Sequence, residues 1–113
     1  MLTSKEYREL QGKRTHKAEI ERGRELFAVL PNSHLYITSQ NHRLRGSAGI
    51  PDCMVFYDGR FCFWEVKVGN DSLSPAQALF IERAEGADVD VCVGDLGDLV
   101  DHLGIGKQEM QHG

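Results

Sequence analysis

The chain has 113 residues, of which 41% are hydrophobic and 27% are charged. This length fits one globular domain with a sizeable core and is too short for two domains. No apolar run approaches the roughly 20 residues that span a bilayer, and residues 1–6 lack the apolar region of a signal peptide. We therefore expect one soluble, cytoplasmic domain over residues 1–113, with flexible ends at 1–14 and 104–113.

The net charge of -4 argues against a nucleic-acid partner, but the charges are unevenly distributed. Residues 1–46 carry a balance of +4, whereas residues 47–113 carry -8. A basic run is usually a solvated face, although beside a hydrolytic site it would bind phosphates. The residues expected to contact DNA are Lys13, Arg14, Lys17, His42, Arg43 and Arg45.

The first predicted element is a helix over residues 17–30, which Pro31 closes. Apolar and small residues recur in it at helical spacing. A short strand over 35–39 follows by residue preference, and the Asn-, Arg-, Ser- and Gly-rich stretch 40–49 is expected to be a loop. That loop delivers the chain to Pro51 and Asp52.

A β-hairpin is predicted next, with strands over 53–57 and 61–68 joined at Asp58-Gly59, which is a strong turn signal. The second strand is apolar on both faces, so we expect it to be central in the sheet.

The run Ser74-Pro75-Ala76-Gln77 is typical of a helix start, with Ser at the cap and Gln three residues later. The strand over 89–93 comes after this crossover helix, so we expect it to lie parallel to the 61–68 strand. A short helix over 95–103 ends the fold. The order predicts an α/β protein with an α-β-β-β-α-β core and a mixed sheet flanked by helices.

The three cysteines, Cys53, Cys62 and Cys92, all fall inside predicted strands. None forms a Cys-x-x-Cys pair or lies near a histidine at zinc-ligand spacing. We interpret them as small buried hydrophobic residues, which suits a reducing compartment.

Asp52, Glu65 and Lys67 are the residues that carry chemistry. The predicted hairpin folds Asp52 back toward Glu65, and strand alternation puts Glu65 and Lys67 on one face. Burying two carboxylates is costly unless a divalent cation holds them together. Pro-Asp is also a common turn opening, and Glu-x-Lys can arise on any solvated strand. The two patterns together, one hairpin apart, favour a metal site.

Three motifs in this order resemble the PD-(D/E)xK nuclease superfamily, and within it the small stand-alone VRR-NUC nucleases of phages. The motifs are Gly49-Ile50-Pro51-Asp52, Phe63-Trp64-Glu65-Val66-Lys67 and Leu73-Ser74-Pro75-Ala76-Gln77. The resemblance covers residues 17–103. It implies a restriction-endonuclease-like fold and a Mg²⁺- or Mn²⁺-dependent DNA endonuclease. It also implies a homodimer that acts on branched DNA such as four-way (Holliday) junctions, and is compatible with phage encoding in a bacterial host.

The resemblance implies that Asp52 and Glu65 bind the metal together with the main-chain carbonyl of Val66. Lys67 would orient or activate the attacking water or stabilise charge on the phosphate, and sequence leaves these roles open. Gln77 would hydrogen-bond a catalytic group or phosphate; its alternative is to cap the helix end.

The family pattern also places a glutamate on the first helix, where Glu19, Glu21 and Glu25 compete. We choose Glu19 because it shares a helical stripe with Gly23, which would direct it toward Asp52. A surface position in an exposed turn is the alternative.

Two other functions are compatible with parts of the sequence. A histidine-based nuclease or zinc site would use His16, His34 or His42, but no partner spacing supports it, so these are expected to be loop or DNA-facing side chains. The other is a catalytically silent nucleic-acid-binding or dimerisation module with the same fold. The intact Asp52, Glu65 and Lys67 argue against that second possibility.

Overall fold

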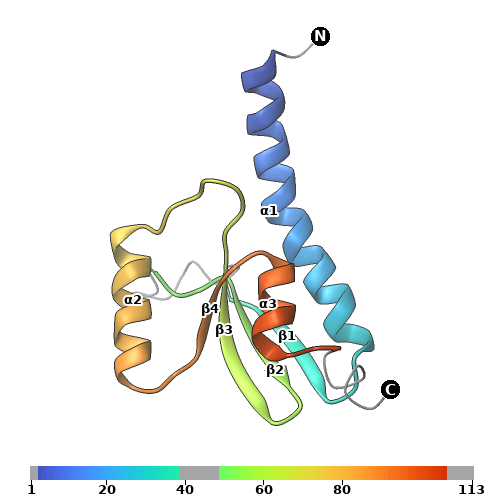
Figure 1. Cartoon of the computed structure of the whole chain (residues 1–113), viewed down its shortest axis with the longest axis vertical. Coiled ribbons are helices and arrows are strands. Elements are labelled where there is room, and N and C mark those ends of the chain that lie inside the picture. The colour runs from blue at the N-terminus through green and yellow to red at the C-terminus, as the bar shows by residue number, and fades with distance from the viewer. Residues whose placement is uncertain (1–2, 39–48, 107–113) are drawn as a thin grey trace.

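The computed structural model describes residues 3–38 and 49–106, and in the first helix it describes side chains from His16 onward. The chain is an α/β protein with the predicted order of elements (Figure 1). The elements are α1 (Ser4–Val29), β1 (Ser33–Ile37), β2 (Cys53–Tyr57), β3 (Arg60–Val66), α2 (Pro75–Gly86), β4 (Val91–Gly94) and α3 (Leu96–Leu103).

The strands form a four-stranded mixed sheet in the order β1-β2-β3-β4. β1, β2 and β3 pair antiparallel, and β4 pairs parallel to β3. The predictions of a central β3 and a parallel last strand are therefore confirmed. Asp58 and Gly59 join β2 to β3 with φ of 48° and 81°, the positive values that a tight two-residue hairpin turn requires.

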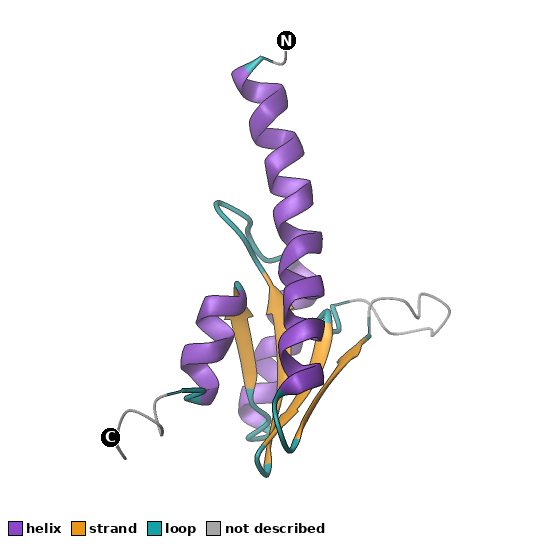
Figure 2. Cartoon of the chain, turned by 90° about the vertical axis from the view of Figure 1, so that its right-hand side faces the viewer, coloured by secondary structure: helices purple, strands orange, loops and turns teal. Residues whose placement is uncertain are grey.

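Helices cover both faces of the sheet. α1 and α3 lie on one face and α2 lies on the other, and the N-terminal part of α1 extends beyond the sheet (Figures 1 and 2). The alternation of β3 fits this layering, since Trp64 points into the core under α1 while Phe63 stacks edge-on against Phe80 of α2 at 5.0 Å.

Trp64 lies at the centre of the core. It is fully buried, and its indole Nε1 donates a hydrogen bond to the Gly94 carbonyl at 3.0 Å. A Cβ on Gly23 would lie 2.8 Å from the Trp64 ring, so the glycine lets α1 approach the sheet closely. The core consists of Phe27, Leu35, Cys53, Val55, Cys62, Trp64, Val66, Cys92, Leu99 and Leu103.

Both ends of the described chain differ from expectation. Helix α1 begins at Ser4 rather than at residue 17, because the preceding segment is rich in Glu, Lys, Arg and Gln, which have high helix propensity. Gly104 caps α3 with a left-handed φ of 70°. The Ile105 amide donates a hydrogen bond to the Val100 carbonyl, and the Ile105 side chain packs on the core. Residues 104–106 are thus part of the fold, and 107–113 lie outside the described residues.

β1 begins and ends two residues earlier than the predicted strand. Within the described ranges, no helix is both long and apolar enough to cross a bilayer.

Candidate active site

Asp52 and Glu65 lie opposite each other where β2 begins and β3 ends, one step beyond the Cys53–Trp64 pair. The Asp52 amide donates to Glu65 Oε2 at 3.2 Å, and the Val66 amide donates to Asp52 Oδ2 at 2.9 Å. Each side of the hairpin therefore gives a main-chain donor to the carboxylate of the other. This reciprocal arrangement fixes the two acids side by side.

The backbone around Asp52 is held from both sides. The Thr38 amide donates to the Asp52 carbonyl at 2.8 Å, and the Thr38 hydroxyl donates to the carbonyl of buried Pro51. Gly49 has a φ of +86°, and a Cβ there would collide with the Ala76 carbonyl in the first turn of α2. Glycine is required for this close passage, which explains its place before Pro51 and Asp52.

Lys67 and Gln77 both reach Glu65. Lys67 Nζ lies 3.7 Å from Glu65 Oε1, and Gln77 Nε2 donates to the same oxygen at 2.5 Å. The Gln77 Oε1 atom accepts from the Ser74 amide at 2.8 Å, which completes the predicted capping box. Gln77 therefore makes both kinds of contact that the sequence left open. Its side-chain oxygen caps the start of α2, and its side-chain nitrogen donates to Glu65.

Glu65 is the buried acid of the cluster, with a residue exposure of only 2%. Burial and the neighbouring charge of Asp52 raise the pKa of Glu65 to about 7, against the lowering effect of Lys67. Two carboxylates thus lie side by side in a poorly solvated position, and the Lys67 ammonium pairs with that of Glu65. Their oxygen donors and their excess negative charge fit a hard divalent cation such as Mg²⁺ or Mn²⁺.

His16 is a neighbour of the site that the sequence patterns did not indicate. It lies in α1 rather than in a loop, and its Nε2 atom is 3.7 Å from Asp52 Oδ2. The sequence feature that could have indicated this position is helical spacing. His16 lies seven residues before the buried Gly23 and therefore on the same face of the helix.

Glu19 has different contacts from those expected. Its Oε2 atom accepts from the Leu96 amide at 2.7 Å, and its Oε1 atom lies 3.8 Å from Arg22 Nη1. The carboxylate therefore satisfies a free amide in the first turn of α3 instead of pointing toward Asp52. Glu21 and Glu25, its competitors, are exposed.

The predicted DNA contacts fall mostly outside the described side chains. Lys17 is exposed on α1, and Lys13 and Arg14 lie in the same helix. His42, Arg43 and Arg45 lie outside the described residues. The amide of Val66 binds Asp52, and its carbonyl as a metal ligand stays a prediction.

The chain matches no family model, no curated protein and no solved structure. The nuclease resemblance therefore stays a prediction, and the functional conclusion depends on the side chains and their contacts.

Proposed function

We propose that the chain is a metal-dependent DNA endonuclease. Its active site for hydrolysis of phosphodiester bonds would consist of Asp52, Glu65 and Lys67. The observation that carries this proposal is the pair of carboxylates locked together across the β2–β3 hairpin, with the Lys67 ammonium beside them. Such a pair is costly to maintain without a cation, and hydrolysis of a phosphodiester needs one.

Asp52 and Glu65 would hold Mg²⁺ or Mn²⁺, with the Val66 carbonyl as the proposed third ligand. When bound, such a cation polarises the phosphate and lowers the pKa of water. Gln77 acts as a positioning residue, since its hydrogen bond holds the Glu65 carboxylate while its other end is fixed at the α2 cap.

Lys67 supplies a positive charge on the same strand face as Glu65. Its side chain is 19% exposed, so a phosphate or a water molecule can approach it from solvent. An ammonium in this place donates hydrogen bonds to a non-bridging phosphate oxygen or orients the attacking water. His16, with a side chain 37% exposed beside Asp52, would donate to the same phosphate.

The substrate class we propose is branched DNA, and we propose that a homodimer binds it. One small domain has limited surface for reading the sequence of a long duplex. His42, Arg43 and Arg45, which lie outside the described residues, are the proposed phosphate contacts. The described residues on either side of the segment 39–48 lie close to the proposed site. The Thr38 amide donates to the Asp52 main-chain carbonyl, and Gly49 packs against the backbone of Ala76 and Gln77 in α2.

The test is a cleavage assay on supercoiled plasmid and on single-stranded, duplex, flap and four-way DNA, with Mg²⁺, Mn²⁺ or EDTA. We expect cleavage with either cation and none in EDTA, and the fastest cutting on a branched substrate. Cleavage that persists in EDTA would contradict the metal-dependent chemistry.

Charge reversal at Arg43 and Arg45 is expected to weaken DNA binding and to flatten its salt dependence. Removing one interaction with a phosphate should reduce the slope of log K against log salt by about 1. Binding titrations at several salt concentrations measure this slope. Arg83→Glu, at an exposed position in the last turn of α2, is the matched control. An unchanged slope in the Arg43 and Arg45 variants would count against the proposed contacts.

The second candidate is a catalytically silent nucleic-acid-binding module. The observation in its favour is that Glu65 already has the Asp52 amide, Gln77 and Lys67 as partners inside the protein. DNA binding without cleavage under any metal condition would support it in place of the nuclease.

A further inference from the structure

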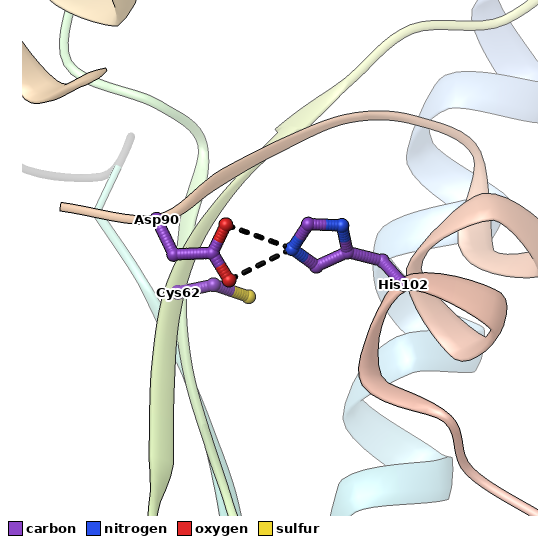
Figure 3. Close-up of side chains that lie close together, drawn as sticks. All are labelled: Cys62, Asp90 and His102. Carbon is purple, nitrogen blue, oxygen red and sulfur yellow. Dashed lines mark hydrogen bonds and ion pairs between the residues drawn. The ribbon is translucent and has the colours of Figure 1, made fainter. Parts of the chain in front are cut away.

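A second group of ligating side chains lies on the opposite face of β3 from Glu65. It consists of Cys62 in β3, Asp90 just before β4 and His102 in α3 (Figure 3). His102 Nε2 lies 2.9 and 2.8 Å from the two carboxylate oxygens of Asp90. One ligand atom from each of the three residues lies within 4.8 Å of the other two.

The backbone that carries each of these side chains is fixed by contacts that need no ion. The Phe63 amide, next to Cys62, donates to the Asp90 carbonyl at 2.9 Å. Arg60 Nη1 donates to the Leu103 carbonyl at 3.1 Å, and its Nη2 donates to the His102 carbonyl at 3.5 Å. Strand β3 thus holds both partners of Cys62 in place, and a preorganised site needs little further ordering to bind an ion.

We propose that Cys62, Asp90 and His102 bind one Zn²⁺ ion, at a site separate from the Asp52–Glu65 pair. Sulfur, imidazole nitrogen and carboxylate oxygen are the donors that zinc takes, whereas Mg²⁺ takes oxygen ligands. A thiolate and a carboxylate balance the charge of the ion. Binding therefore converts the Cys62 thiol to a thiolate, forms the zinc–sulfur bond and releases the proton to solvent.

The exposure of the three residues fits a site entered from one side. Cys62 is fully buried, whereas the side chains of Asp90 and His102 are 39% and 32% exposed, so water can take the fourth position. Zinc ligands at 2.0–2.3 Å from the ion lie roughly 3.3–3.5 Å apart. The ligand atoms of His102 and Asp90, now 2.8–2.9 Å apart, would separate slightly, and Cys62 Sγ, which lies within 4.8 Å of both, would close on the ion. The ion would tie α3 to the sheet.

The test is a cobalt titration of the full chain, stripped of metal and kept reduced without a thiol reagent. We expect the visible bands of tetrahedral cobalt and a near-ultraviolet thiolate-to-cobalt band to saturate together at one equivalent of Co²⁺ bound at this site, and both to disappear on adding Zn²⁺; Co²⁺ held by the carboxylates of Asp52 and Glu65 would give no thiolate band. Zn²⁺ should also raise the Tm. Cys62→Ser should abolish the thiolate band, and Asp90→Asn and His102→Gln should weaken binding at least about tenfold.

The matched control is Cys92→Ser, at a buried cysteine on the neighbouring strand, which should keep the thiolate band. Asp52→Asn should keep it as well, so this outcome is independent of the nuclease site. Absence of a thiolate band in the wild type would overturn the proposal and leave the contact between His102 and Asp90 as a hydrogen bond alone. The proposal is also overturned if the thiolate band survives Cys62→Ser. Binding of Co²⁺ as tight as that of the wild type in Asp90→Asn and His102→Gln, whose positions are more exposed than Cys62, would overturn it as well.

Discussion

Asp52→Asn and Lys67→Ala are each expected to reduce the rate of DNA cleavage by about 10³-fold or more. Asn keeps the size of Asp52 and an oxygen that accepts from the Val66 amide, but it removes the negative charge that would hold a cation. Lys67→Ala removes the ammonium that lies 3.7 Å from Glu65 Oε1. Both changes act on the chemical step, so kcat should fall more than KM rises. Single-turnover cleavage in saturating Mg²⁺ or Mn²⁺ measures the effect.

The control for charge is Asp71→Asn, at an exposed position after β3, which should cleave like the wild type. Circular dichroism and the Tm should show that the Asp52 and Lys67 variants stay folded. Folded variants that retain wild-type cleavage would refute the assignment of the active site.

The free energy of unfolding is expected to fall as the pH rises from 5 to 8 when divalent ions are absent. The pKa of Glu65 is raised in the folded protein from 4.5 to about 7, so the folded state holds this proton more tightly than the unfolded state. Such a group contributes stability that is fully present below pH 4.5 and is lost as the pH rises through about 7. From pH 5 to pH 8 the decrease should be about 2 to 3 kcal/mol.

Glu65→Gln isolates this contribution because the amide does not titrate. In EDTA, the free energy of unfolding of the wild type should fall relative to Glu65→Gln as the pH rises from 5 to 8. Urea unfolding at several pH values measures the difference, with Glu82→Gln on the exposed side of α2 as the control. Mn²⁺ at pH 8 should stabilise the wild type and leave Glu65→Gln nearly unchanged. Parallel pH profiles for wild type and Glu65→Gln would show that the ionisation of Glu65 does not destabilise the fold.

Local patterns in the sequence were sufficient to predict the order of the elements and the placement of Asp52 opposite Glu65. Apolar alternation and the Asp58-Gly59 turn defined the hairpin, and the Ser74 to Gln77 run defined the start of α2. These are local signals, since strand period, turn type and cap are set by residues a few positions apart. A hairpin also fixes register, so the positions of Asp52 and Glu65 along the chain are sufficient to place them opposite each other.

Which distant side chains meet depends on how the helices pack on the sheet. His16, not Glu19, reaches Asp52, since the Glu19 carboxylate accepts from the Leu96 amide in the first turn of α3. Gln77 reaches Glu65 because α2 packs on the same face of β3. Cys62 and His102 are far apart in sequence and meet only because α3 returns to the sheet beside Asp90. Contacts of this kind depend on the packing of helices and strands, which residue spacing along the chain does not specify.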